Sequence, residues 1–253
     1  MDELEQGLRH WLLDRDPEPL EGLDERMRRV YRRQVRRSLI KGVRIGLPIT
    51  VNMVDEEWLE GLIGLWLEMS PPTTRLYWRL PIEFGIWLRG EADQASIDLV
   101  HPAVLELIHW ESMVVDIRNA PEWEESQLST EVVDEGQVVL DPSARLGIYG
   151  HPVYRMTRES EDWPEAQSVP SFVVGFREEE RPMWRVIPPQ VGQLLGQCAQ
   201  GLSVGQGLDA LEEVYGQIDR GSLKEGVEAL VERGIVRGFE VGAVGDQEGP
   251  GRE

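Results

Sequence analysis

The sequence is poor in the residues that build disulfides and metal sites. Its 253 residues include one cysteine and four histidines. A single cysteine, Cys198, cannot form an internal disulfide or a cysteine-based zinc site. No histidine lies within four residues of another or of the cysteine, since the four are His10, His101, His109 and His151. Because metal ligands usually recur at short spacing, we expect no metal and no other cofactor in this chain.

Long apolar runs are also missing. The longest strongly apolar stretch, Leu62 to Leu67, is far too short to cross a bilayer. The acidic segment from Met1 to Asp16 does not contain the hydrophobic region of a signal peptide. These two absences predict a cytoplasmic protein with no membrane partner.

Positive charge is scarce relative to negative charge. Lys and Arg number 26 against 46 Asp and Glu, so the formal net charge is −20. Such a chain is repelled by the phosphates of nucleic acids and by anionic lipid headgroups, and nucleic-acid binding is therefore not expected. Hydrophobic residues make up 41% of the chain, which is enough to form a sizeable core and too many for a disordered protein.

Residues 1–119 have the pattern of a helical bundle domain. Apolar residues recur at helical spacing, and Pro, Gly or capping residues separate the segments. Asp55 is a suitable N-cap, and Pro102 occupies the first turn of a helix, where proline is favoured. Short loops between helices favour an antiparallel bundle, with helices expected over residues 2–13, 24–41, 55–70, 82–88 and 101–118.

The composition changes at Ala120, and residues 120–240 combine short strands with helices. β-Branched and aromatic residues between Gly and Pro predict strands over 138–140, 145–149, 153–156, 171–177, 183–187 and 235–240. Helices are expected over 189–199, 203–215 and 222–233. The segments 171–177 and 183–187 are expected to form a β-hairpin with a charged turn.

A hairpin, three helices and a closing strand are typical of a winged-helix-like domain. The predicted fold class is therefore α+β, with an N-terminal helical bundle followed by a winged-helix-like domain that contains a β-hairpin. Residues 241–253 are rich in Gly and acidic residues and are expected to form a flexible tail.

One catalytic motif occurs, but its context is wrong. Gly201-Leu202-Ser203-Val204-Gly205 matches the G-x-S-x-G nucleophile elbow of hydrolases. That elbow requires a strand before the serine and a histidine later in the chain. Here a helix precedes the motif, and the last histidine is His151. We therefore expect Gly201 to end one helix and Ser203 to cap the next.

The segment from Arg26 to Arg44 is unusually basic for this chain. It contains nine basic residues and no acidic one. On a helical wheel, one face carries four arginines that are candidates for docking an acidic partner: Arg29, Arg32, Arg33 and Arg36. The other interpretation is a solvated helix face that neutralises nearby carboxylates.

Glu111 lies within an apolar helix stripe. On the wheel it falls among Val104, Leu107, Ile108 and Val115. A carboxylate in this position must be paired or lie at an interface. We expect an internal partner for Glu111, such as an arginine.

Three segments carry motifs of a known family. Residues 30–72 contain a Tyr-Arg helix, a proline break, an acidic helix start and a Pro-Pro end, in VYRRQVRRSLIKGVRIGLPITVNMVDEEWLEGLIGLWLEMSPP. Residues 101–122 read HPAVLELIHWESMVVDIRNAPE, and residues 140–156 read LDPSARLGIYGHPVYRM. Through these segments the chain resembles the HvfC-like proteins over most of residues 5–240. Leu47-Pro48 replaces the usual Phe-Pro of that family, and His151-Pro152 replaces Tyr-Pro.

The resemblance implies a non-catalytic partner protein. Better-understood members form heterodimers with multinuclear non-heme iron enzymes of TIM-barrel fold, which oxidatively modify ribosomally made precursor peptides. The partner protein helps to present the precursor, and its C-terminal module resembles the elements that bind leader peptides. Any iron would then belong to the enzyme. The alternative function is a transcriptional regulator that binds DNA through the winged-helix module and the basic helix.

A peptide could extend the free edge of the expected hairpin, beside the third helix of the module. The candidate residues for this contact lie on the strand and on the facing helix: Met183, Trp184, Val186, Val227, Leu230 and Val231. The helix residues could equally form the module's own core. Trp184 is the preferred anchor because aromatic residues are frequent hot spots at interfaces.

Overall fold

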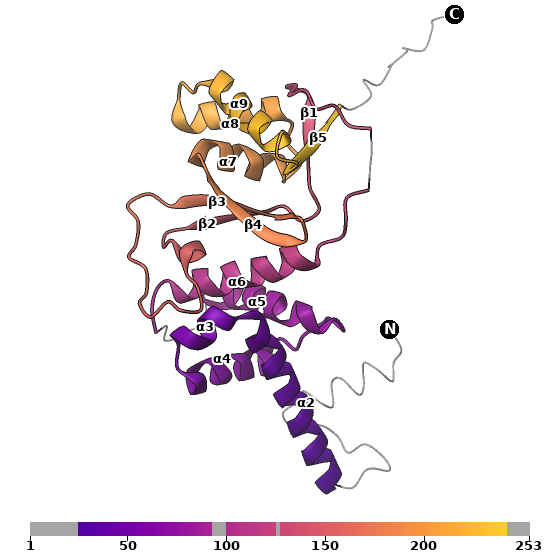
Figure 1. Cartoon of the computed structure of the whole chain (residues 1–253), viewed down its shortest axis with the longest axis vertical. Helices are drawn as coiled ribbons and strands as arrows, with labels where there is room; N and C mark the ends of the chain where they lie inside the picture. Colours follow the sequence, from indigo (N-terminus) through magenta and orange to yellow (C-terminus); the bar gives the residue numbers. More distant parts are fainter. Residues whose placement is uncertain (1–24, 93–99, 125–126, 242–253) are drawn as a thin grey trace, which may run out of the picture. The chain divides into compact units, whose positions relative to one another are not determined.

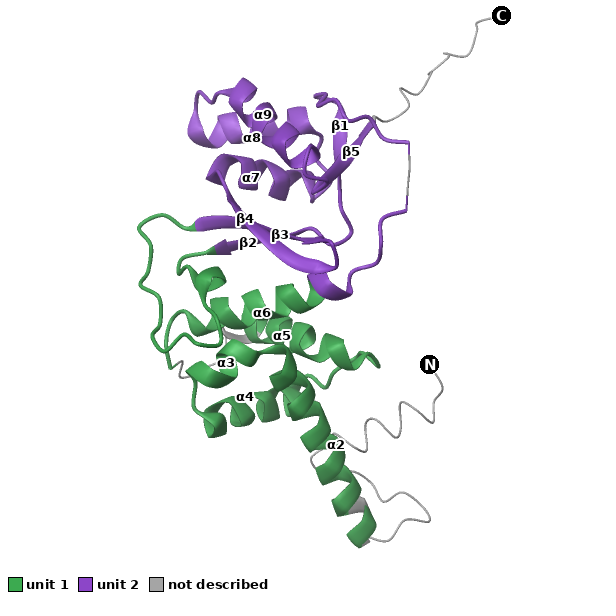
Figure 2. Cartoon of the chain, in the orientation of Figure 1, with its two compact units in different colours: residues 1–116, 149–170 green, residues 117–148, 171–253 purple. Residues whose placement is uncertain are grey.

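The computed structural model describes residues 25–92, 100–124 and 127–241 (Figure 1). The chain divides into two compact units, which Figure 2 shows in different colours. Unit 1 contains residues 1–116 and 149–170, and unit 2 contains residues 117–148 and 171–253. The expected division at residue 119 differs from this, because residues 149–170 return to the helical unit. The expected helix over 2–13 and nearly all of the expected tail, 241–253, lie outside the described residues.

Unit 1 is mainly helical. Asp55 caps one helix as expected, because its Oδ1 accepts hydrogen bonds from the backbone N–H groups of Glu57 and Trp58 at 2.9 and 3.1 Å. The helices are α2 (Glu25–Gly46), α3 (Pro48–Met53), α4 (Glu56–Met69), α5 (Leu80–Ala92) and α6 (Val104–Asn119), with short 3₁₀ turns η1 (Tyr77–Arg79) and η2 (Val153–Arg155). The prediction of an N-terminal helical region is confirmed.

The core of unit 1 forms where α2, α4, α5 and α6 meet. Trp66 packs edge-on against Phe84, with ring centroids 5.6 Å apart, and both side chains are fully buried. The C-terminal half of α2 approaches this core closely because Gly42 and Gly46 have no side chain. A Cβ atom at either glycine would collide with Leu80 or Pro81.

Unit 2 combines two small sheets with three helices. Strand β1 (Gly136–Leu140) pairs with β5 (Val236–Val241) in an antiparallel sheet. A second sheet has the strand order β2-β3-β4, and β3 and β4 are antiparallel. Its strands are β2 (Arg145–Tyr149), β3 (Ser171–Glu178) and β4 (Arg181–Ile187), and the helices are α7 (Pro189–Cys198), α8 (Val204–Tyr215) and α9 (Arg220–Val231).

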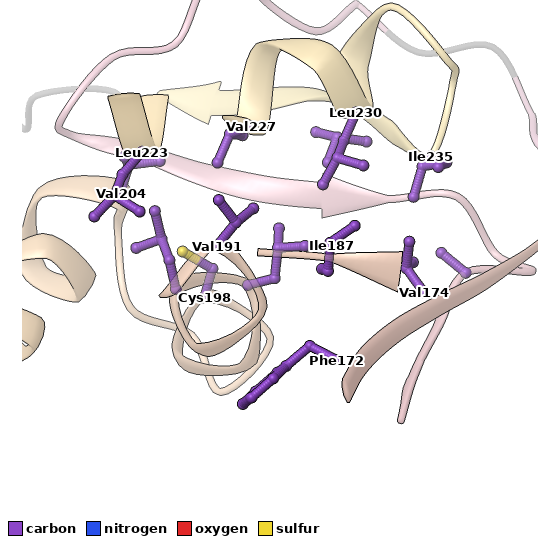
Figure 3. Packing of buried hydrophobic residues seen from close by; sticks show 14 of the residues in the cluster. Phe172, Val174, Ile187, Val191, Cys198, Val204, Leu223, Val227, Leu230 and Ile235 are labelled. Atoms are coloured by element: carbon purple, nitrogen blue, oxygen red, sulfur yellow. The ribbon is translucent and has the colours of Figure 1, made fainter. Parts of the chain in front are cut away.

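The helices of unit 2 enclose an aliphatic core. Figure 3 shows Val191 of α7, Leu223, Val227 and Leu230 of α9, and Ile187 of β4 around one interior. Ser203 caps α8 in a capping box with Gln206, as the sequence predicts. Gly201 ends the preceding turn with a φ of 97°, a conformation that favours glycine.

The closing strand connects to a segment far from it in the chain. After β1, the carboxylate of Asp141 accepts a hydrogen bond from Arg237 Nε of β5 at 2.8 Å. Burial alone would raise the pKa of Asp141, but bonds from Ser143 and Arg237 hold that pKa below its ordinary value. The closing strand therefore joins β1, and the hairpin of β3 and β4 joins β2.

Two local predictions are wrong. The expected strand over 153–156 is the 3₁₀ turn η2, where Val153 and Tyr154 are buried. Their apolar character reflects burial, since they are 0% and 3% exposed, and not strand formation. Helix α3 was not expected, because the residues after Pro48 include the β-branched Ile49, Thr50 and Val51, which have modest helix propensity.

Candidate functional site

Strand β4 is one of the two edge strands of its sheet, and β2 is the other. Among the described strands, only β3 lies beside β4. Three of its apolar side chains remain accessible, since Met183, Trp184 and Val186 are 40%, 44% and 53% exposed. Edge strands offer backbone N–H and C=O groups that an added strand can use, so β4 has the properties of a peptide-binding edge.

The strand register places these side chains on two faces of the sheet. Trp184 lies opposite Gly175, and Val186 lies opposite Val173. Met183 instead lies opposite Phe176, which belongs to the core of unit 2. Because side chains alternate along a strand, Trp184 and Val186 occupy the face turned away from that core. Trp184 and Val186 therefore lie on one side of β4, and Met183 lies on the other.

The predicted residues of the facing helix do not lie with Trp184. Val227 and Leu230 are buried in the core of unit 2 (Figure 3). Val231 is partly buried and packs against that core. Ile187 of β4 belongs to the same core, so its side chain lies on the opposite face of the strand from Trp184 and Val186. The predicted contact surface shared by Trp184 and α9 is thus wrong, and the interpretation of Val227 and Leu230 as core residues holds.

The turn of the hairpin has an unusual backbone. Glu178 pairs with Arg181, so the loop consists of Glu179 and Glu180. Both have positive φ values, of 46° and 67°, which are typical of a two-residue type I′ turn. Asn and Gly normally occupy such positions because a larger side chain costs energy there. The charged turn that the sequence predicts is therefore present, in a conformation that the sequence does not suggest.

The basic face of α2 is partly neutralised within unit 1. Arg36 Nη1 lies 3.1 Å from Glu68 Oε1 of α4. Arg44 pairs with two glutamates of α4, with Glu60 at 2.6 Å and also with Glu56. Arg29 and Arg33 are exposed, and Arg32 is half-buried. The interpretation as a face that neutralises nearby carboxylates thus holds for Arg36 and Arg44, and docking of an acidic partner stays a prediction.

Glu111 has an internal partner of an unexpected kind. Its carboxylate accepts hydrogen bonds from the backbone N–H groups of Ile49 at 2.6 Å and Thr50 at 2.8 Å, and from the Thr50 hydroxyl at 2.7 Å. These groups form the first turn of α3, whose N-cap residue makes no side-chain cap. Burial raises the pKa of Glu111 to about 7, although these hydrogen bonds oppose the shift. The expected arginine is thus replaced by a helix N-terminus.

The structure also brings together a cluster that the sequence spacing conceals. The rings of His101 and Trp163 stack with centroids 4.8 Å apart, and the His151 ring lies 5.8 Å from that of His101. Glu106 accepts backbone hydrogen bonds from Gly150 and His151, at 3.1 and 2.8 Å. These contacts fix the segment after β2 to helix α6. No pattern within one segment could indicate them, because the partners are more than 40 residues apart in the chain.

Two further titratable groups have shifted pKa values: His109, which is half-buried, and Cys198, which is buried. His109 Nδ1 lies 3.0 Å from the hydroxyl of Tyr149. Burial, with the positive charge of Arg89, lowers the pKa of His109 to about 4, so this ring is neutral near pH 7. Burial raises the pKa of the Cys198 thiol to about 11, which makes this thiol a poor nucleophile near pH 7.

The described residues contain no group of three or more His, Cys, Asp or Glu side chains that could hold a metal ion. None of the described helices is both long enough and apolar enough to cross a membrane. The sequence matches no protein-family model, and a search of curated proteins gives no match.

Proposed function

We propose that this protein is a non-catalytic accessory subunit that forms a heterodimer with a multinuclear non-heme iron enzyme and binds that enzyme's ribosomally made precursor peptide. The observation that carries the proposal is the free edge of β4 with its exposed Trp184 and Val186. The resemblance to HvfC-like proteins suggests the identity of the enzyme and of the peptide. Iron would be held by the enzyme, and the reaction would take place there.

The edge of β4 has definite requirements for its ligand. An added strand would gain backbone hydrogen bonds and would turn alternate side chains toward the two faces of the sheet. On one face it would meet Trp184 and Val186, which favour apolar residues. On the other face it would meet Arg185 and Arg181, both exposed, which favour acidic residues. The proposed ligand is therefore an extended peptide with alternating apolar and acidic positions.

The module that carries this edge is proposed to be winged-helix-like. Helices α7, α8 and α9 are consecutive and share one core, and strand β5 follows them. In this arrangement α9 supports the core through Val227 and Leu230. Peptide contacts would come from β4 instead of from α9.

Three arginines in the first turns of α2 are proposed to dock the enzyme. Arg29, Arg32 and Arg33 lie on the part of α2 that precedes its packed half. Arg36 pairs with Glu68, so docking at Arg36 would have to displace that carboxylate. Charged docking surfaces mainly increase the rate of association, so this contact would weaken with salt.

The DNA-binding alternative has weak electrostatic support. A recognition helix needs cations that can contact phosphates and bases. In α9, Lys224 Nζ lies 2.7 Å from Asp134, and Arg220 pairs with both Asp209 and Glu212. These contacts neutralise two cations of the helix. Competition by a specific promoter sequence in a mobility-shift assay would favour this alternative over the accessory subunit.

The peptide site can be tested with the Trp184→Ala variant. We expect it to weaken binding of the synthetic precursor by more than about 1 kcal/mol, the usual threshold for an important interface residue. If the proposal holds, a short Cys-rich reading frame beside an iron-enzyme gene would encode this precursor, and calorimetry measures its affinity. Heterodimer formation with the co-expressed enzyme, followed by size-exclusion chromatography, should be unchanged.

Val214→Ala is the matched control, since Val214 is an exposed side chain on α8 of the same unit. This variant should bind the precursor like the original protein. Unchanged affinity in a folded Trp184→Ala variant would place the peptide site elsewhere. Failure to form any complex with the enzyme would refute the accessory-subunit proposal itself.

A further inference from the structure

The hairpin of β3 and β4 fixes which backbone groups of β4 point away from its partner strand. In an antiparallel pair, residues that exchange two hydrogen bonds alternate with residues that exchange none. Glu178 and Arg181 flank the two-residue turn and are a bonded pair. Arg177 and Pro182, the next pair, are therefore a non-bonded pair. The Arg177 N–H accordingly points away from β4, because it donates to Ser143 Oγ at 2.9 Å.

The outer edge of β4 is limited at both ends. In steps of two from Pro182, the backbone groups of Trp184 and Val186 are turned away from β3. The strand ends one residue after Val186, and the carbonyl of Pro188 already accepts the N–H of Gly192 in α7 at 3.0 Å. An added strand therefore has only the edge between Pro182 and Pro188 for pairing.

Pro182 stands where a proline affects an added strand and not the hairpin. Its nitrogen carries no hydrogen, and the ring Cδ takes the place of that hydrogen. The pair that Pro182 forms with Arg177 is non-bonded, so the β3–β4 ladder loses no hydrogen bond. At the outer edge, the ring blocks the close approach that an added strand requires.

Charge along the hairpin changes sign close to this proline. Arg181 and Arg185 of β4 are exposed, within a chain of net charge −20. Glu179 and Glu180 form the tip and are exposed as well. An acidic peptide is therefore attracted along β4 and repelled at the tip. The β4 strand of a second copy would bring two further arginines to this edge, and like charges oppose that contact.

We propose, on the basis of the proposed peptide-binding function, that Pro182 is a specificity-determining residue that sets the register and the length of the bound strand. The occupant is an extended acidic peptide that pairs with Val186 and ends short of Pro182. Of the seven residues of β4, the five from Met183 to Ile187 remain for pairing. Roughly five residues of the peptide lie opposite them, because paired strands have nearly the same rise per residue.

Two fluorescent peptides test the limit on length in the full chain. The first has five residues, alternating Val and Glu, and the second carries one additional glycine at each end. The glycines add backbone groups without charge or side chains. In fluorescence anisotropy the original protein should bind both peptides within about twofold, because the ring of Pro182 prevents a further bonded pair. The Pro182→Ala variant has an N–H at this edge and should bind the longer peptide about fivefold more tightly than the shorter one.

Pro189→Ala is the matched control, because Pro189 is an exposed proline of the same unit that lies in the first turn of α7. It should behave like the original protein. An equal effect of the glycines in the original protein and in Pro182→Ala would overturn the proposal. Self-association of Pro182→Ala in sedimentation, without an effect of peptide length, would also overturn it, because the proline would then only guard the edge against a second copy.

The outcome for the proposed function is read separately. Binding of both peptides with no effect of Pro182→Ala removes the limit on length but keeps β4 as a peptide-binding strand. Failure of both peptides to bind any of the three proteins would overturn the peptide edge itself, and the role of Pro182 with it.

A second pair of variants tests the register at Val186. Val186→Pro and Val186→Ala both lose the valine side chain, but only the first loses the outward N–H. The proline removes no bond to β3, because Val186 and Val173 are a non-bonded pair. We expect the five-residue peptide to bind Val186→Pro about fivefold more weakly than Val186→Ala. Equal affinities in two folded variants would overturn the proposed register.

Discussion

The buried carboxylate of Glu111 allows a quantitative test of the fold. It is 3% exposed and accepts three hydrogen bonds from the first turn of α3. In the Glu111→Gln variant, the amide NH₂ group cannot accept from the backbone N–H of Thr50. A buried N–H group without a partner costs about 1–3 kcal/mol. We expect the variant to be less stable than the original protein by this amount at pH 5.

The same substitution should change the pH dependence of stability. The pKa of Glu111 is raised from 4.5 to about 7, so the folded protein binds this proton more tightly than the unfolded chain does. The resulting stabilisation is complete below pH 4.5 and is lost as the pH rises through about 7. A shift of this size corresponds to as much as about 3 kcal/mol. Glutamine does not titrate, so the stability difference between the two proteins should shrink between pH 5 and pH 8.

Urea unfolding followed by tryptophan fluorescence at pH 5, 6, 7 and 8 measures this difference. Other carboxylates contribute equally to both proteins, and the comparison removes their effect. A Thr50→Val variant serves as a control, because losing the hydroxyl donor should raise the pKa of Glu111 further and move the change to higher pH. Stability curves that run parallel over the whole range would refute the argument from burial.

Two further predictions concern unit 2. Glu180→Gly should stabilise the hairpin by about 0.5–1 kcal/mol, because Glu180 has a positive φ of 67° and glycine relieves that strain. The control Glu178→Gly, within β3, should destabilise the hairpin. Thermal unfolding measures both variants, and a loss of stability in Glu180→Gly as well as in Glu178→Gly would contradict the turn conformation. Arg177→Ala should destabilise unit 2 by about 1–2 kcal/mol, because Arg177 Nη1 donates to the carbonyl of Ala120 at 2.8 Å and Nη2 to that of Pro121 at 3.2 Å. Arg177→Lys should recover part of this loss in urea unfolding, and equal stability of all three proteins would mean that the contact contributes nothing.

Most helices and strands follow from local patterns in the sequence. Asp55 and Ser203 cap helices where the sequence predicts, because capping depends on residues within one turn. The wheel also identifies Glu111 as a buried carboxylate that needs a partner. It cannot identify the partner, because backbone N–H groups 61 and 62 residues away carry no residue-type signal. Pairing of β1 with β5 is hidden for the same reason, since it joins segments about 100 residues apart.

The candidate site was predictable to a similar extent. The apolar residues of β4 are visible in the sequence, and so is their alternation. The face on which each lies depends on the register with β3, which puts Trp184 opposite Gly175 and turns it away from Val227. Helical spacing correctly groups Val227 with Leu230 but does not distinguish a groove from a core. That distinction required the position of α9 relative to α7 and β4.

The contacts that escape prediction share one physical form. In each case a charged side chain contacts backbone groups of a distant segment. Glu111 contacts the start of α3, Arg177 contacts the segment after α6, and Glu106 contacts residues 150–151. Helix ends and tight turns leave such groups unsatisfied, and a distant charge can replace a local cap. A helix of six residues such as α3 is too short to be stable alone in water. Its helical state therefore depends on Glu111, and loss of that carboxylate should unfold α3 before it disturbs the longer helices of unit 1.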